Sequence, residues 1–269
     1  MADHHVGDGG RSRIEKLSFD DVTPLIVVGP PRSGTRFVTA VLNGIPDVQL
    51  YSEIRDEILA PMRKSMKRAE GVYASSDREG LSENWTSKKR ALMYSLWHGL
   101  SADRQRPPRK KSLYIGYKTP FHEQHFEFYN RYFDPVRPVY ICCIRSFVDH
   151  FLSVQARWPR HGIAYTAVRY IRSLRKIRRM KAERPDEVIV FVLDDCRDQG
   201  YAYIQERLLR PLGLDEHPRA RRRAEKGAVN TAEKFGVARA DALTLRQRIV
   251  LWILPGTSRA FEALRRDVS

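Results

Sequence analysis

The clearest feature of the chain is a set of three continuous apolar stretches, at residues 24–28, 139–144 and 188–193. Apolar residues at consecutive positions are typical of strands that are buried on both faces of a parallel sheet. Two further stretches, at 48–51 and 113–117, predict shorter strands. We therefore expect the three long stretches to form the centre of the sheet.

Segments with helical periodicity separate these strands. Apolar residues recur at helical spacing from 36 to 43, so a strand, a loop, a helix and a second strand follow one another. This alternation predicts an α/β fold, a three-layer sandwich with a mostly parallel central sheet. Helices are also predicted over 56–100 with a polar break at 71–85, over 146–157 with Ser146 as cap, over 163–184, over 201–212, and from 241 onward with a break at 255–256, whereas 218–236 is predicted to be a basic, loop-like stretch.

Length and composition bound the organisation and the location of the protein. The chain has 269 residues, a length that predicts a single domain over 21–269. Residues 1–20 are rich in His, Gly, Asp and Arg, which predicts a flexible lead-in. The lead-in is polar and has no apolar signal-peptide core, and no apolar run reaches the ~20 residues that a membrane span requires. Three cysteines are too few for a disulfide framework or a typical metal cluster. These features favour a cytoplasmic location.

The charge balance points to an anionic partner. Lys plus Arg number 48 and Asp plus Glu number 32, so the net charge is 48 − 32 = +16. A surface this basic suits a nucleotide, a nucleic acid, or a sulfated or phosphorylated compound. A basic nucleic-acid-binding protein is therefore one alternative, but the sequence lacks zinc spacing and a recognisable RNA-recognition or helix-turn-helix pattern. We expect no nucleic-acid partner.

A candidate phosphate-binding loop follows the first strand. Gly29 and Gly34 frame a tight turn, and Thr35 opens the next helix. Backbone amides at such a helix N-terminus bind anions. The nucleoside-triphosphatase version needs a Lys after the second glycine, which is absent, and Arg32 is the strong cation of the turn. A nucleotide or sugar kinase with an atypical loop, or a plain Gly/Pro turn, remains the alternative.

The loop and a second motif together resemble the sulfotransferase family. Residues 31–35, Pro-Arg-Ser-Gly-Thr, resemble the 5′-phosphosulfate loop of enzymes that use 3′-phosphoadenosine 5′-phosphosulfate (PAPS). Arg145 at a strand end and Ser153, eight residues later, resemble the family's 3′-phosphate element, although Ser-Phe replaces the usual Asn-Pro after the arginine. Leu-Gly-Leu at 212–214 also matches, and the likeness spans 24–230. The resemblance implies a P-loop-like fold, PAPS as donor, PAP as product and no metal.

The resemblance also implies catalytic roles. The loop is closest to the tyrosylprotein and bacterial Pro-Arg-Ser-Gly-Thr branch, in which a Glu after the second strand is the base, and Glu53 holds that place. Arg32 and Lys118 would stabilise the leaving oxygen. His122 is the alternative base, because the small-molecule branch uses a His shortly after a Lys-Thr pair. A strand-end Lys at the surface is the plain alternative for Lys118.

The remaining predicted site residues bind the donor or surround the acceptor. Ser33, Gly34, Thr35 and Arg36 should supply amides and hydroxyls to the 5′-phosphate, as does Arg32. Lys226 resembles a late loop that closes over the donor, with a solvated basic loop as the alternative. Variable acceptor loops are expected at 55–109 and 158–165. The acceptor is a small molecule, carbohydrate or other compound with a hydroxyl, or an amine, and the sequence leaves its identity and the oligomeric state open.

Overall fold

The computed structural model describes residues 21–74, 81–100, 112–227, 243–253 and 256–267. The predicted lead-in over 1–20 lies outside this range. Within it, five strands form one sheet in the order β2-β3-β1-β4-β5, and every pairing is parallel, which confirms the predicted α/β fold. The strands are β1 (Thr23–Val28), β2 (Val48–Tyr51), β3 (Tyr114–Lys118), β4 (Val139–Ile144) and β5 (Val188–Val192).

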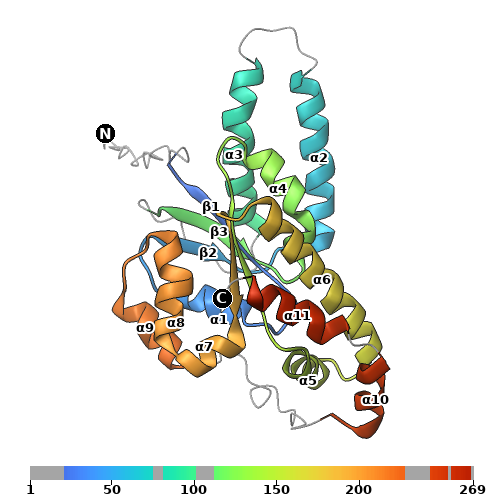
Figure 1. The fold of residues 1–269 in the computed structure, drawn as a ribbon. Helices are drawn as coiled ribbons and strands as arrows, with labels where there is room; N and C mark the ends of the chain where they lie inside the picture. Colours follow the sequence, from blue (N-terminus) through green and yellow to red (C-terminus); the bar gives the residue numbers. More distant parts are fainter. Residues whose placement is uncertain (1–20, 75–80, 101–111, 228–242, 254–255, 268–269) are drawn as a thin grey trace, which may run out of the picture.

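Helices cover both faces of the sheet (Figure 1). Helices α1, α8 and α9 lie on one face, and α3, α4, α6 and α11 lie on the other, while α2 and α3 extend away from the sheet as a pair. The helices are α1 (Thr35–Leu42), α2 (Asp56–Ala74), α3 (Leu81–Leu100), η1 (His122–His125), α4 (Phe126–Phe133), α5 (Phe147–Arg157), α6 (Ile163–Glu183), α7 (Leu193–Gln199), α8 (Tyr201–Ile204), η2 (Gln205–Leu209), η3 (Arg210–Leu212), α9 (Pro218–Glu225), α10 (Leu245–Ile253) and α11 (Gly256–Arg266).

The strand register brings the carboxyl ends of neighbouring strands together at one end of the sheet. Strand β1 is central, and its Val27 pairs with Lys118 of β3 and Ile141 of β4. Thr119 extends this arrangement, because its N–H donates to the Val27 carbonyl and its hydroxyl accepts from the N–H of Ile54, which follows β2. Segments after β1, β2 and β3 therefore meet where ligands bind in open parallel sheets.

The predicted place of residues 188–193 as a central strand is wrong. Strand β5 lies at the edge of the described sheet, and Leu193 already belongs to α7. The strand is apolar throughout because helices shield it: the Phe191 ring contacts the ring of Tyr203, whose hydroxyl accepts a hydrogen bond from the N–H of Val192. A continuous apolar run thus indicates burial but not position in the sheet.

Two local predictions also differ from the structure. Ser146 stands at the N-cap of α5, but its hydroxyl makes no capping bond and instead lies 3.4 Å from a carboxylate oxygen of Asp149. Part of the predicted loop at 218–236 is helix α9, which begins at Pro218. Proline is favourable at the first position of a helix, because the N–H that it lacks would have no partner within the helix. The rest of that stretch from residue 228 lies outside the described range. No helix in the described part of the chain is long and apolar enough to cross a membrane.

Candidate active site

The loop between β1 and α1 has an unusual backbone conformation. Gly34 is the N-cap residue of α1 and has φ +95°, and a Cβ atom there would lie 3.0 Å from a methyl carbon of Leu193. Arg32 also has a positive φ, +70°, which is costly for a residue other than glycine. Such strain is typical of ligand-binding loops. The loop therefore makes a sharp, strained turn between β1 and α1.

The Arg32 side chain contacts helix α5, which carries Ser153 of the predicted donor site. Its Nε donates to the Ser153 hydroxyl at 3.0 Å, although 121 residues separate the two positions. Burial lowers the pKa of Arg32, and the positive charges of Arg157 and Arg36 lower it further. Three arginines thus gather around the loop and create a positive potential that suits an anion. Sequence reasoning missed Arg157, although it lies one helical turn after Ser153 on α5.

The remaining loop residues differ in accessibility. The Ser33 side chain is fully buried, and its hydroxyl has no hydrogen-bond partner in the described part of the protein. Thr35 is the first residue of α1 and is also buried, whereas Arg36 is exposed. The first N–H groups of a helix have no partner within the helix. The loop therefore offers a buried hydroxyl and helix N-terminal amides beside exposed positive charge.

Two buried side chains, which sequence reasoning did not single out, form hydrogen bonds with the backbone of the loop. The carboxylate of Glu123 accepts bonds from the Ser173 hydroxyl and from the Gly29 N–H, and burial raises the pKa of this glutamate. The ring of His150 donates to the Pro31 carbonyl, and burial, followed by the charge of Arg145, lowers the pKa of His150 to about 3. The imidazole is consequently neutral near pH 7. Both groups hold backbone atoms of the loop in place.

Glu53 and Lys118 form a short ion pair at the same sheet edge. The Lys118 side chain is 3% exposed and that of Glu53 is 45% exposed. Lys118 is the last residue of β3 and pairs in register with Val27, two residues before the loop begins at Gly29. The pair thus contains one buried cation and one solvent-accessible carboxylate. Such a carboxylate can accept a proton from a group that approaches from solvent.

His122 occupies a different environment. Its side chain is 1% exposed, its Nδ1 lies 2.9 Å from the Tyr117 hydroxyl, and its Nε2 lies 3.1 Å from Oδ1 of Asp56. Burial, followed by the nearby charge of His125, lowers the pKa of His122 to about 3. The ring is neutral near pH 7, but it is buried and its Nε2 faces Asp56 rather than solvent.

Arg145 lies among carboxylates. Its guanidinium is buried and lies 3.2 Å from Asp149 and 3.8 Å from Asp194. A cavity of about 470 Å³ adjoins these groups. The ionisable groups of its lining are Asp149, Asp194, Asp198, Glu262, Arg197 and Arg265. The Arg145 charge is therefore already compensated by carboxylates, which weakens its attraction for a phosphate.

Lys226 lies away from these contacts. It is exposed and follows the last turn of α9. Helix α9 packs against α1, and Arg223 donates to the Ala40 carbonyl at 2.7 Å. In the described part of the chain, no hydrogen bond or ion pair joins Lys226 to the loop at 29–34.

The fold defines the class: an α/β protein in which the first strand of a parallel sheet is followed by a glycine-containing loop and a helix. The chain belongs to the sulfotransferase family, whose family model matches residues 24–192. Its fold is similar to the sulfotransferase domain of the Synechococcus PCC 7002 olefin synthase, at 16% identity and a TM-score of 0.50, over 86% of this chain and 93% of that one.

A second solved structure, sulfotransferase STF1 from Mycobacterium tuberculosis H37Rv, aligns over 81% of this chain and 74% of its own, at 11% identity and a TM-score of 0.48. No curated protein matches the sequence. Identities this low describe the fold alone.

Proposed function

We propose that the protein transfers the sulfuryl group of PAPS to a hydroxyl, or an amine, of a small-molecule or carbohydrate acceptor. The observation that carries this proposal is the strained loop that holds Arg32 against Ser153, at the same sheet edge as the Glu53–Lys118 pair. An anion-binding loop, two cations and an accessible carboxylate are the groups that sulfuryl transfer requires.

The donor end of the site fits a 5′-phosphosulfate. The buried Ser33 hydroxyl and the first amides of α1 can bind phosphate oxygens, and a bound anion relieves the repulsion that lowers the pKa of Arg32. The contact with Arg32 supports a position for Ser153 beside this anion. A kinase is less well supported, because the loop has Arg32 two residues before Gly34 and no lysine after it.

In the proposed reaction, the acceptor oxygen or nitrogen attacks the sulfur as the bond from sulfur to the bridging phosphate oxygen breaks. The acceptor proton passes to the Glu53 carboxylate, and PAP leaves with the bonding electrons. Arg32 and Lys118 stabilise the negative charge that develops on the bridging oxygen, as cations do in phosphoryl transfer. The transferred sulfuryl group ends as a sulfate ester or sulfamate.

Accessibility supports Glu53 over His122 as the base. Glu53 is half exposed, whereas the His122 ring is buried and faces Asp56 and Tyr117. A base must come within hydrogen-bond reach of the proton it removes. His122 would meet this condition only after Asp56 moves, whereas the Glu53 carboxylate is open to the solvent from which an acceptor would approach.

The acceptor side carries an exposed group of aromatic rings. Trp158 stacks on His161 with centroids 5.7 Å apart and planes at 20°, and His161 contacts the ring of Tyr165. Trp158 directly follows Arg157, whose charge acts on Arg32. Stacked, half-exposed rings favour an acceptor with a flat or ring-shaped apolar surface, such as a phenol or a sugar.

The test is incubation with ³⁵S-labelled PAPS and a panel of phenols, sugars and amines. We expect label to appear on at least one acceptor together with PAP, and the Arg32→Ala variant to lose this transfer. Arg175→Ala, which removes an exposed arginine of α6 without a described ion pair, is the matched control and should keep it. ATP-dependent phosphorylation of the same panel, without consumption of PAPS, would contradict the proposal.

A further inference from the structure

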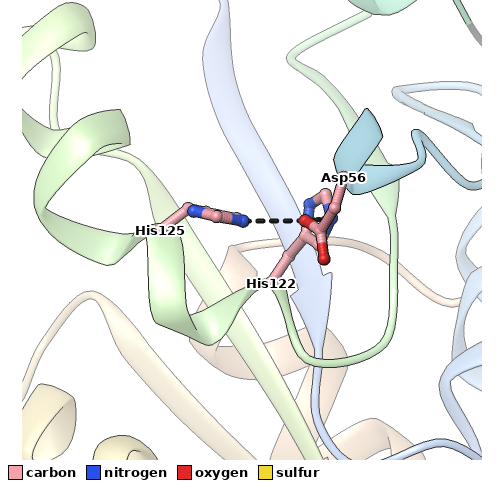
Figure 2. Close-up of side chains that lie close together, drawn as sticks. All are labelled: Asp56, His122 and His125. Carbon is pink, nitrogen blue, oxygen red and sulfur yellow. Dashed lines mark hydrogen bonds and ion pairs between the residues drawn. The ribbon is translucent and has the colours of Figure 1, made fainter. Parts of the chain in front are cut away.

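Two histidines and one aspartate form a cluster (Figure 2), and these residues lie close in sequence to Glu53 and Lys118. Oδ1 of Asp56, the first residue of α2, lies 3.1 Å from His122 Nε2 and 3.0 Å from His125 Nε2. The three atoms all lie within 4.8 Å of one another. The histidines are the first and last residues of the 3₁₀ helix η1, where side chains three residues apart project from the same side. The local backbone thus aims both imidazoles at one carboxylate.

The contacts of His122 indicate which of its two ring nitrogens carries the proton. Its Nδ1 lies 2.9 Å from the Tyr117 hydroxyl, and that hydroxyl donates to Tyr129 at 2.6 Å. The Tyr117 oxygen therefore accepts the Nδ1 proton, so Nε2 carries a lone pair. This Nε2 is buried and lies 3.1 Å from Asp56 Oδ1, in a geometry that is poor for a hydrogen bond.

A lone pair that faces a carboxylate oxygen is electrostatically unfavourable, and a bound cation would remove this repulsion. Histidines that bind metals commonly donate their other ring N–H to an outer acceptor, which fixes the tautomer. The Tyr117 hydroxyl supplies this acceptor for His122, and Tyr129 in turn fixes the hydroxyl. The buried ring is therefore oriented as a metal ligand would be.

His125 requires one rearrangement. Arg63 lies 3.1 Å from His125 Nδ1, and a guanidinium only donates, so in this state the proton is on Nε2 and points to Asp56. Metal binding moves that proton from Nε2 to Nδ1 and displaces Arg63. The Arg63 side chain is exposed and can turn into solvent. The net protonation of His125 does not change.

We propose that Asp56, His122 and His125 bind a divalent transition-metal ion of the zinc type. Two imidazoles and one carboxylate suit such ions, and three protein ligands leave a position open for water or an acceptor atom. The ion would tie the start of α2 to η1, close in sequence to Glu53 and Lys118. This site goes beyond the proposed reaction and departs from the expectation of no metal.

The test is metal binding by the untagged full-length chain. His4 and His5 lie outside the described residues, and both are changed to Gln in every sample so that they do not bind the probe. After treatment with a chelator and dialysis, Zn²⁺ is added, and bound metal is counted by elemental analysis and titrated by calorimetry. Co²⁺ absorption in the visible range then reports the ligand geometry. These readouts do not depend on PAPS or on activity.

We expect one Zn²⁺ per chain in the parent. Asp56→Asn and His125→Gln should each weaken binding by about 100-fold or more, since even outer-sphere changes weaken metal sites 10- to 100-fold. The Asp56 side chain is 71% exposed, so its variant should fold, which circular dichroism checks. His161→Gln is the matched control and should bind Zn²⁺ normally. A parent that binds no Zn²⁺, or variants that bind it as tightly as the parent, would overturn the proposal.

Discussion

Replacement of Glu53 by Gln separates the proposed base from the ion pair that it forms. Gln keeps the shape and can still accept a hydrogen bond from Lys118, but it cannot take the acceptor proton. General-base catalysis contributes about 10²- to 10⁴-fold, so we expect turnover to fall by this factor. Because Glu53 lies outside the contacts of the loop at 29–34, PAP affinity should change by less than about twofold.

The structure also bounds the cost in stability. An exposed ion pair contributes about 0–1 kcal/mol, whereas breaking a buried pair costs about 3–5 kcal/mol. Lys118 is 3% exposed and Glu53 is 45% exposed, so the pair lies between these limits. We expect the free energy of unfolding to fall by about 1–2 kcal/mol, measured by denaturant titration.

The assay measures initial rates with PAPS, calorimetry with PAP, and unfolding on the same preparations. Glu183→Gln is the matched control, because this last residue of α6 is 46% exposed and ion-paired with Arg179, and its variant should leave all three values near the parent's. His122→Asn should lower turnover much less than Glu53→Gln. If Glu53→Gln kept more than about a third of the parental turnover, or if the order of these two variants were reversed, the assignment of Glu53 would be wrong.

Three further predictions concern the donor site and its support. Arg145→Ala should weaken PAP binding by about 1.5–3 kcal/mol by calorimetry, the contribution of a charge-assisted contact with the 3′-phosphate, and unchanged affinity would remove this side chain from the donor site and leave it only the ion pairs with Asp149 and Asp194. Gly34→Ala should cost about 1–3 kcal/mol in unfolding free energy, because φ is +95° and the new Cβ meets Leu193; a neutral effect would contradict this reasoning. His150 has a pKa of about 3 against an ordinary 6.5, so the unfolded chain binds more protons between these pH values. The unfolding free energy should therefore fall by up to about 1.4 kcal/mol per pH unit below pH 6.5 for this residue, and His150→Asn should flatten that slope in denaturant titrations from pH 4 to 8.

Local patterns predicted most of the secondary structure because each depends on neighbouring residues. The apolar runs at 48–51 and 139–144 coincide with β2 and β4, and the break at Gly34 falls where α1 begins. The position of β5 could not be predicted in this way. Its apolar composition reflects burial, whereas its place at the sheet edge depends on how the whole chain crosses over.

The contacts of the candidate site were less accessible from sequence. The motif placed Arg32 and Ser153 on different phosphates of the donor, whereas in the structure they contact each other across 121 residues. Arg157 and the buried Glu123 carry no pattern that distinguishes them from other charged residues, and only the packing of α5 and η1 under the loop shows their role. Aspartate is common in the first turn of a helix, so the sequence around Asp56 does not indicate a special role. Its contacts with His122 and His125 depend on the tertiary structure.

The most direct test of the proposed donor is calorimetric titration of the purified chain with PAP, with 5′-AMP and with ATP plus Mg²⁺. PAP and 5′-AMP differ only in the 3′-phosphate. A charge-assisted contact to that group contributes about 1.5–3 kcal/mol, so PAP should bind about 10- to 150-fold more tightly than 5′-AMP, and ATP with Mg²⁺ should bind weakly. Tight binding of ATP with Mg²⁺, together with equal affinities for PAP and 5′-AMP, would contradict a PAPS-dependent sulfotransferase.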